Sequence, residues 1–257
     1  MRLRGPLLAG LACTATTAPA YPAQQAAIVA HRGQSRDVPE NTIAAFRQSL
    51  ERGVAIIELD LRITKDGQLV VIHDEALDRT TNCSGRVSDM DLSGIKRCNA
   101  GGGERVPSFS EVLSFVRSKP VRILADVKDG TPLAPVIEEI RSHQAGRQLI
   151  LGVRSTKHAA RARAALPDST ILAYMPAIAD APAFATAGAH IIRLWSDWVE
   201  ADPGLIVRTR ALGPQVWIMV GHDLPTRKRD WRALHGRMIA AGAQGLITDR
   251  PDLISAP

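Results

Sequence analysis

The amino-acid sequence predicts an α/β protein, specifically a TIM (β/α)8 barrel with a short inserted segment. Short apolar runs bounded by turn residues alternate with longer segments of helical periodicity through residues 21–257, a pattern typical of parallel strand–helix units. The chain has 257 residues, a length at which such a barrel forms one domain. Hydrophobic residues make up 45% and charged residues 23%, which is enough for a large core.

The elements of this barrel follow from the apolar runs, since a closed barrel needs eight strands. We expect strands at residues 28–30, 56–61, 122–127, 149–152, 171–174, 191–194, 216–220 and 245–248. We expect helices between them at residues 42–52, 110–117, 132–143, 156–166 and 231–241. Asn41 or Thr42 would cap the first helix, and Gly242 follows the last one.

Residues 1–20 are typical of a secretory signal. Arg2 and Arg4 precede a short apolar stretch that ends in small residues, so cleavage is expected before Tyr21. We therefore expect a secreted or periplasmic protein, and a buried N-terminal segment is the alternative. No other apolar run is long enough to predict a transmembrane segment.

The insertion is expected at about residues 64–107, between the second and third barrel strands. Asp66 and Gly67 predict a hairpin, and the glycine run 101–103 predicts a surface turn, because no helix cap follows it. The segment holds Cys83 and Cys98. Two cysteines in an oxidising compartment suggest a disulfide, whereas two free, buried thiols are the alternative.

The charge pattern argues against a nucleic-acid partner. The formal net charge is +6, and it falls to +4 without the two arginines of residues 1–20. The longest basic run is residues 227–229, and aromatic residues are 4% of the chain. Interleaved basic and aromatic platforms for stacking bases are therefore absent from the sequence.

Polar residues follow the predicted strands at their carboxyl ends, where the active sites of TIM barrels form. His31 and Arg32 follow the first strand, and Asp126 and Lys128 end the third. His73 follows the apolar run QLVVI inside the insertion. An imidazole can both take and give a proton at neutral pH, so we expect acid/base catalysis by the two histidines. Arg32 and Lys128 would hold an anion.

Glu58 and Asp60 point to the same face of the second strand, because side chains alternate along a strand. Two inward carboxylates at that spacing repel strongly unless a cation lies between them. With Asp126 they form an all-oxygen ligand set that suits Ca²⁺ or Mg²⁺. The alternative is a structural network in which Arg32, Arg62 and Lys128 neutralise the acids.

A series of short motifs occurs in order along the chain. HRG, PENT and AF are followed by IELD, TKDGQLVVIHDEALDRTT, RVPSFSEVL and DVK, and the series ends with GAQGLITDRPDLI. This ordered set resembles the glycerophosphodiester phosphodiesterase family over about residues 27–254. The resemblance implies a TIM barrel with a small insertion, a divalent metal, and hydrolysis of glycerophosphodiesters to glycerol 3-phosphate and an alcohol.

The resemblance also implies roles for individual residues. His31 and His73 match the acid/base pair, and Glu58 and Asp60 match the metal ligands. The phosphate contacts would be Arg32 and Lys128. We expect one histidine, His31, to deprotonate the attacking hydroxyl and the other, His73, to protonate the leaving alcohol. That hydroxyl belongs either to water or to the substrate's own glycerol, and the second case would give a cyclic phosphate.

Three positions depart from the family pattern. Asp126 stands where the E-x-K element has glutamate, so a metal must shift or admit a water. WIMVG from Trp217 lacks the threonine, valine and asparagine expected there. RLWSDWVEAD from Arg193 is unexpected after the sixth strand. Trp195 and Trp198 in that segment would form either an apolar rim for a lipid-like leaving group or part of the core.

Two alternative functions remain open. The sphingomyelinase D and phospholipase D toxins share the barrel, both histidines, an aspartate as third ligand and a disulfide in the catalytic loop. Asp126 and the Cys83 and Cys98 pair are similar to that group, which would make the protein a lysophospholipase D-like enzyme acting on lipids. The motifs PENT, RTT and ITDRPD favour the first family. A non-catalytic glycerophosphodiester-binding protein is the other alternative.

Overall fold

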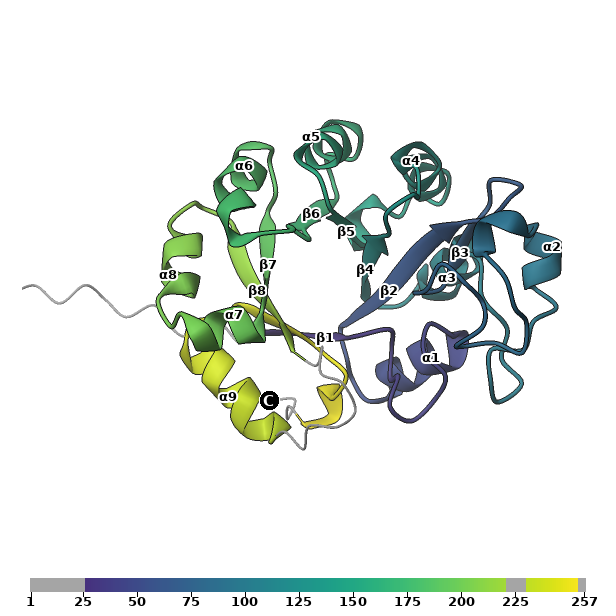
Figure 1. The fold of residues 1–257 in the computed structure, drawn as a ribbon, viewed down its shortest axis with the longest axis horizontal. Coiled ribbons are helices and arrows are strands. Elements are labelled where there is room, and N and C mark those ends of the chain that lie inside the picture. Colours follow the sequence, from purple (N-terminus) through teal and green to yellow (C-terminus); the bar gives the residue numbers. More distant parts are fainter. Residues whose placement is uncertain (1–25, 221–229, 254–257) are drawn as a thin grey trace, which may run out of the picture.

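The computed structural model describes residues 26–220 and 230–253 (Figure 1). The predicted export signal, residues 1–20, and the basic run at residues 227–229 lie outside these residues. Within the described part of the chain, no helix combines the length and the apolar character needed to cross a membrane.

Eight parallel strands close into a barrel. Their order is β1-β2-β4-β5-β6-β7-β8-β9, and β1 closes the ring by pairing with both β2 and β9. The strands are β1 (Ala27–Ala30), β2 (Ile56–Ile63), β4 (Arg122–Val127), β5 (Leu149–Val153), β6 (Thr170–Ala173), β7 (Ile191–Trp195), β8 (Gln215–Val220) and β9 (Gly245–Thr248), with β3 (Leu69–Val71) outside the ring. The predicted TIM barrel is confirmed, and every predicted barrel strand is present to within two residues at either end.

Helices surround the barrel on its outside (Figure 1). They are α1 (Ile43–Glu51), α3 (Phe109–Val116), α4 (Leu133–Ser142), α5 (Thr156–Ala165), α6 (Ala181–Thr186), α7 (Ser196–Ala201), α8 (Leu205–Arg210) and α9 (Trp231–Ala240), whereas α2 (Leu92–Ile95) belongs to the insertion. The five predicted helices are confirmed to within one residue at each end. The sequence analysis missed α2, α6, α7 and α8, because helices of four to six residues are too short to show a periodic apolar face.

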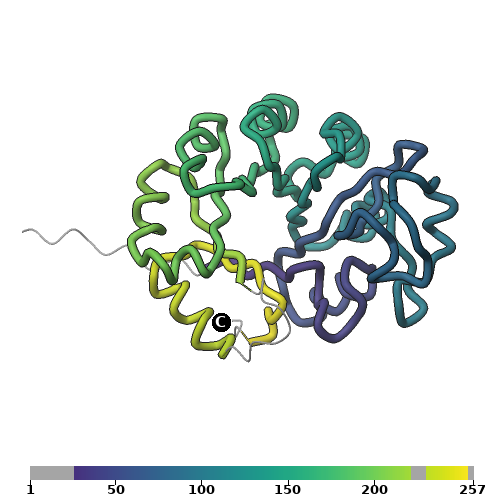
Figure 2. Tube along the Cα trace, viewed as in Figure 1, coloured from purple at the N-terminus to yellow at the C-terminus, as the bar shows by residue number. Residues whose placement is uncertain are grey.

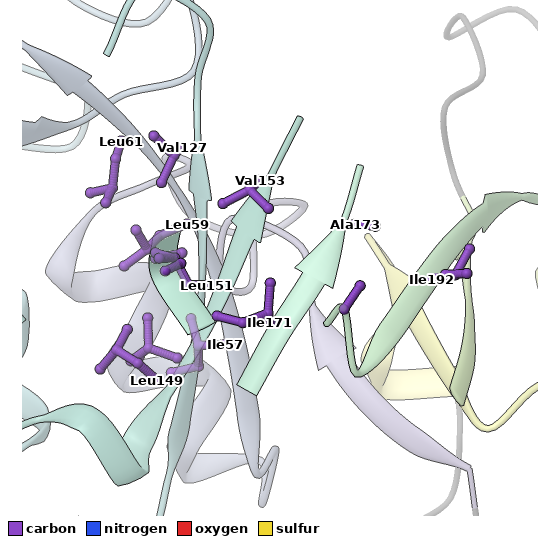
Figure 3. Close-up of a cluster of buried hydrophobic side chains, with 14 of the residues drawn as sticks. Ile57, Leu59, Leu61, Val127, Leu149, Leu151, Val153, Ile171, Ala173 and Ile192 are labelled. Atoms are coloured by element: carbon purple, nitrogen blue, oxygen red, sulfur yellow. The ribbon is translucent and has the colours of Figure 1, made fainter. Parts of the chain in front are cut away.

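The two faces of the strands fill different spaces. On β2, Ile57, Leu59 and Leu61 point outward and pack beneath the helices (Figure 3). Because side chains alternate, Glu58 and Asp60 of the same strand point into the barrel. The apolar residues inside the barrel are Val29, Ile56, Leu124, Ile150, Leu172, Tyr174, Ile191, Trp217, Met219 and Ile247. The interior is therefore mostly apolar, and the acids of β2 stand above these apolar residues at the carboxyl end.

Hydroxyl caps start the two helices that flank this end of β2. Thr42 caps α1 by accepting a hydrogen bond of 3.2 Å from the backbone N–H of Ala45. Ser108 and Glu111 form a reciprocal capping box at the start of α3. Of the two residues predicted to cap α1, Thr42 takes that role and Asn41 is free to turn toward the barrel mouth.

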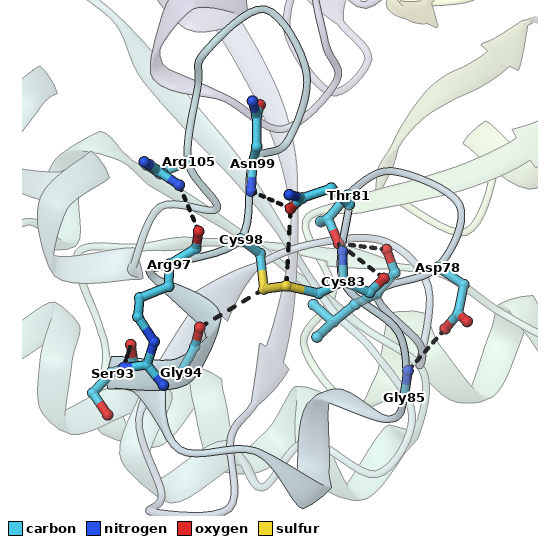
Figure 4. Close-up of a disulfide and its surroundings, with 12 residues drawn as sticks. Asp78, Thr81, Cys83, Gly85, Ser93, Gly94, Arg97, Cys98, Asn99 and Arg105 are labelled. Atoms are coloured by element: carbon cyan, nitrogen blue, oxygen red, sulfur yellow. Dashed lines mark hydrogen bonds between the residues drawn. A yellow bond between two sulfur atoms is a disulfide. The ribbon is translucent and has the colours of Figure 1, made fainter.

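The insertion has its own small core beside the barrel. Its first part is an antiparallel hairpin of β2 and β3 that turns at Gly67, as predicted. Its core residues are Val70, Ile72, Leu77, Val87, Ile95, Cys98, Ala100 and Val106. Cys83 and Cys98 form the predicted disulfide, with their Cα atoms 5.6 Å apart (Figure 4). The alternative of two free thiols is therefore wrong.

The closure of the barrel brings its first and last strands, β1 and β9, together. Figure 2 shows the purple N-terminal segment beside the yellow C-terminal one. The register pairs Ala30 with Thr248, and the backbone N–H of His31 then donates to the carbonyl of Thr248 at 3.1 Å. Residues that follow β1 and β9 therefore meet at one edge of the mouth, although they are separated by most of the sequence.

Candidate active site

Three carboxylates converge at the carboxyl end of the barrel. Asp60 of β2 stands directly beside Asp126 of β4 in the parallel register, and Glu58 is one inward position below Asp60. One ligand oxygen from each of the three lies within 4.8 Å of the others, and all three residues are buried. The three acids therefore lie close together, and their role as metal ligands stays a prediction.

Basic side chains surround two of the three acids. Lys128 Nζ lies 2.6 Å from Asp60 Oδ1, as an ion pair rather than an aligned hydrogen bond, and donates to Asp126 Oδ2 at 2.7 Å. Arg154 donates two hydrogen bonds to Asp126, one of them 2.8 Å long. Arg32 Nε lies 3.3 Å from Asp60 Oδ2. Asp60 and Asp126 are thus neutralised in part by protein cations.

Glu58 is less well compensated than its neighbours. It accepts a backbone hydrogen bond of 2.8 Å from Arg32, and His31 Nε2 lies 4.0 Å away. Burial, reinforced by the charge of Asp60, raises the pKa of Glu58 above its usual range. Burial would also raise the pKa of Asp60, but the charges of Lys128 and Arg32 outweigh it and hold that pKa well below its usual range. Glu58 is therefore the acid of the three whose charged form the surrounding cations stabilise least.

His31 is oriented by a carboxylate from the end of the chain. Its Nδ1 lies 2.6 Å from Asp249 Oδ1, which leaves Nε2 facing the carboxylates. Burial alone would lower the pKa of His31, but the charges of Asp249 and Glu58 outweigh it and raise that pKa. The ring is thereby held in one orientation at the mouth.

His73 has a similar partner within the insertion. Its Nδ1 lies 2.6 Å from Asp74 Oδ1, and Arg79 donates to Asp74 and to Glu40 at 2.5 to 3.1 Å. Burial and the charge of Lys128 lower the pKa of His73, in spite of the opposing charge of Asp60. Its side chain remains 35% exposed, so the ring can reach a group that enters from solvent.

The loop after β1 adopts an unusual backbone to place these groups. Arg32 and Asn41 have positive φ angles of 56° and 58°. The two residues are joined by a backbone hydrogen bond of 3.1 Å, and the side chain of Asn41 donates to Asp60 at 2.7 Å. Gly33 lies so close to α1 that a Cβ would come within 2.8 Å of Ala45. The loop is thus folded tightly against both α1 and the carboxylates.

The predicted site residues lie together at the carboxyl end of the barrel. Each of them contacts another member of the group or shifts the pKa of one. They are His31, Arg32, Glu58, Asp60, His73, Asp126 and Lys128. The sequence predicted no role in the site for Glu40, Asn41, Asp74, Arg79, Arg154 and Asp249. Most of these residues lie in the motifs PENT, TKDGQLVVIHDEALDRTT and GAQGLITDRPDLI. Arg154 follows β5, so the rule that polar residues gather at strand ends could have found it.

The two tryptophans near β7 differ in their packing. Trp198 packs against the outer core beneath the helices, so the rim interpretation is wrong for that residue. Trp195 packs against the inner cluster, and the guanidinium carbon of Arg193 lies 3.8 Å from its ring centre. Trp195 therefore stands at the mouth with a cation on its face.

The carboxylate cluster fits a hard divalent cation. Three oxygens that converge within 4.8 Å are the donor set that Ca²⁺ and Mg²⁺ prefer. The raised pKa of Glu58 shows that one more positive charge would be stabilised there. Glu58, Asp60 and Asp126 could therefore hold such an ion, although Arg154 and Lys128 share the oxygens of Asp126.

Comparison with known proteins gives consistent results. The Glycerophosphoryl diester phosphodiesterase family matches residues 31–253. A glycerophosphodiester phosphodiesterase of Caldanaerobacter subterraneus is 34% identical over 242 residues, which are 88% of this chain and 95% of that one. The crystal structure of an Agrobacterium tumefaciens glycerophosphodiester phosphodiesterase is 31% identical with a TM-score of 0.75, over 89% of this chain and 98% of that chain.

A further solved structure shares the fold at lower identity. It is an Oleispira antarctica phosphodiesterase in complex with the product sn-glycerol-3-phosphate, with 21% identity and a TM-score of 0.75 over 87% of this chain and 93% of that one. The family match spans most of the chain, and the relative from Caldanaerobacter is similar over almost its whole length. The chain therefore belongs to the glycerophosphoryl diester phosphodiesterase family and is an enzyme of that family.

Proposed function

We propose that the protein hydrolyses glycerophosphodiesters to glycerol 3-phosphate and an alcohol in a metal-dependent reaction. The observation that carries the proposal is the placement of two histidines, each with a carboxylate on Nδ1, beside three convergent carboxylates. A divalent ion held by Glu58, Asp60 and Asp126 would supply a positive charge for the phosphate oxygens. The product named in the Oleispira antarctica complex supports the glycerol 3-phosphate half of this proposal.

The phosphate would be oriented by protein cations at the same edge. Arg32 and Lys128 both lie against Asp60, one from the loop after β1 and the other from the end of β4. Preorganised positive groups of this kind stabilise the charge that gathers on phosphate oxygens in the transition state. Glu40 accepts from Arg32 at 3.0 Å and so keeps that guanidinium in place.

The histidines would move the two protons of the reaction. In our proposal Nε2 of His31 takes the proton of the attacking hydroxyl, whose oxygen forms a bond to phosphorus. The bond between phosphorus and the alcohol oxygen breaks, and His73 gives a proton to that departing oxygen. Without a metal ion the pKa of His31 is raised and that of His73 is lowered. Because a divalent ion beside Glu58 would oppose the charge that raises the pKa of His31, we keep His31 as the base.

The test is to incubate the purified protein with glycerophosphocholine and, separately, with lysophosphatidylcholine. Each incubation contains Ca²⁺, Mg²⁺ or EDTA, and glycerol 3-phosphate, choline and cyclic phosphate are assayed. Metal-dependent release of glycerol 3-phosphate from glycerophosphocholine is expected. Choline released only from the lipid would instead favour the lysophospholipase D-like alternative. Asp126 and the disulfide of the insertion are the features that support this alternative.

Binding of glycerophosphocholine without any turnover would favour the non-catalytic alternative. We also propose export of the protein, on the basis of residues 1–20. N-terminal sequencing of the exported protein should then begin at Tyr21.

A further inference from the structure

Arg193 is a buried cation inside the barrel. It lies on β7 between Ile191 and Trp195, which pack with the inner cluster, so alternation directs its side chain inward. The residue is 5% exposed. Among the described residues, its Nε and Nη1 have no hydrogen-bond partner and no carboxylate lies within ion-pair distance. Burial lowers the pKa of Arg193 to about 10, so the side chain is still charged at neutral pH.

Two aromatic rings hold this guanidinium. Its central carbon lies 3.8 Å from the ring centre of Trp195 and 5.2 Å from that of Tyr174. Tyr174 follows β6 and lies against the backbone of β5, where a Cβ on Gly152 would come within 2.3 Å of the ring. The buried hydroxyl of Tyr174 also lacks a partner within the described chain. Rigid side chains thus present unused N–H and O–H donors next to one another.

The position of these donors is separate from the predicted phosphate contacts. In the ring of eight strands, β7 stands across the barrel from β2, which carries Glu58 and Asp60. Arg154 also lies against the Tyr174 ring, at 5.1 Å, but its guanidinium is paired with Asp126. Arg193 is therefore the guanidinium with available donors on the side of the mouth opposite β2.

A buried cation without a partner destabilises the folded protein. An anion that binds to it forms charged hydrogen bonds, and these offset the destabilisation. The anion cannot be one of the three site carboxylates, because none of them lies within ion-pair distance of Arg193 in the described structure. The scissile phosphate has Arg32 and Lys128 on the β1 and β4 side of the mouth. A second oxyanion, farther along the substrate, is the group that could reach β7.

We propose that Arg193 and Tyr174 form a subsite for a carboxylate or phosphate carried by the alcohol half of the substrate. The inference rests on the proposed function and specifies its substrate class. A quaternary ammonium group would need a free aromatic face. The Trp195 face is covered by the guanidinium, so a cationic alcohol half meets a like charge there. The enzyme should therefore prefer glycerophosphodiesters whose alcohol half is anionic.

The test compares glycerophosphoserine with glycerophosphoethanolamine, which differ by one carboxylate. The wild-type kcat/KM should favour the serine compound by about tenfold or more, as expected for one buried charged hydrogen bond. R193Q should bring that ratio to about one by raising KM for the serine compound. The ethanolamine compound should lose no rate, because its ammonium no longer meets a like charge. Y174F, which removes one donor, should reduce the ratio by a smaller factor.

The matched control is R122Q. Arg122 is a half-buried arginine at the opposite end of the barrel, where it donates to Thr170 at 2.6 Å. Its loss should leave the serine preference unchanged. R193Q should melt at or above the wild-type temperature, because it removes an unpaired buried charge. A normal melting curve shows that the variant is folded and that its kinetics can be interpreted. If R193Q does not fold, Y174F provides the test.

Equal wild-type kcat/KM values on the two compounds would overturn the subsite while leaving the proposed function intact. An equal loss on both compounds in R193Q would also overturn it, by assigning Arg193 to the scissile phosphate. If neither compound is hydrolysed, the proposed function fails. Calorimetric titration of both compounds in the presence of EDTA then tests whether Arg193 and Tyr174 bind the carboxylate. Tighter binding of the serine compound that is lost in R193Q supports the subsite, and equal binding rejects it.

Discussion

Nδ1 of His31 lies 2.6 Å from the carboxylate of Asp249, which is 218 positions later in the chain. The contact exists because β1 and β9 are neighbours in the closed barrel, with Ala30 paired to Thr248. It leaves Nε2 of His31 facing Glu58 and contributes to the raised pKa of the imidazole. A carboxylate on the far nitrogen of a catalytic histidine sets both the orientation and the basicity of the ring.

Removing that carboxylate gives the first prediction. D249N should lower kcat/KM by about 10²- to 10⁴-fold, because the imidazole loses its orientation. Asp249 raises the pKa of His31, so its loss lowers that pKa. If His31 is the base, the acidic limb of the pH–rate profile should move to lower pH in D249N. Movement of the basic limb instead would make His31 the acid. D252N is the control, since Asp252 pairs with Arg250.

The second prediction concerns His73. H73A should lower turnover by about a hundredfold or more, because the leaving oxygen would depart without a proton. H158A removes an imidazole from α5, on the outside of the barrel, and should leave turnover unchanged. Steady-state kinetics of both variants provide the measurement. Near-normal turnover in H73A would exclude His73 from the proton transfers.

The third prediction follows from the competition for Asp126. Arg154 donates two hydrogen bonds to this carboxylate, so a divalent ion must share its oxygens with a guanidinium. R154Q removes that positive charge and should bind Ca²⁺ or Mg²⁺ about tenfold more tightly. Calorimetric titration measures the change, with R122Q as a control that loses the same charge at the other end of the barrel. Weaker binding in R154Q would mean that Arg154 orients Asp126 for the ion.

The fourth prediction concerns the pH dependence of metal binding. The pKa of Glu58 is raised by burial and by Asp60, so its carboxyl is protonated at higher pH than an ordinary glutamate. A metal ion must displace that proton, and its apparent affinity should therefore increase with pH, by up to about tenfold per pH unit. Proton release during calorimetric titration in two buffers tests the linkage. A pH-independent affinity would exclude Glu58 as a ligand that loses a proton.

The fifth prediction concerns the disulfide of the insertion. The bridge between Cys83 and Cys98 spans 15 residues. Closing a loop of that length stabilises the folded protein by about 3 kcal/mol relative to the unfolded chain. The double variant C83S/C98S should therefore melt about 6 to 12 °C lower than the wild type, on the scale expected for a domain of this size. Differential scanning calorimetry measures the shift. An unchanged melting temperature would show that the insertion is stable without the bridge.

Much of this protein was predictable from local sequence patterns. The alternation in IELD placed Glu58 and Asp60 on one face of a strand, and it requires only the geometry of an extended chain. Caps and turns such as Thr42 and Gly67 are also local, since their hydrogen bonds or backbone angles involve a few neighbouring residues. The eight strands, five helices and hairpin were predicted for the same reason, whereas the disulfide was predicted from two cysteines in a chain expected to be exported.

The remaining contacts required the tertiary structure. The contacts of Asp249 with His31 and of Arg154 with Asp126 depend on the register in which distant strands close the barrel. The same register leaves Nε and Nη1 of Arg193 without a partner among the described residues. A strand end in the sequence shows that a polar side chain reaches the mouth, but not which neighbour it meets there. The sequence by itself thus predicted some of the chemical groups at the mouth, namely the two histidines, the three acids, Arg32 and Lys128. Only the closed barrel decided which charges are paired, because burial and partner distance are properties of the packed fold.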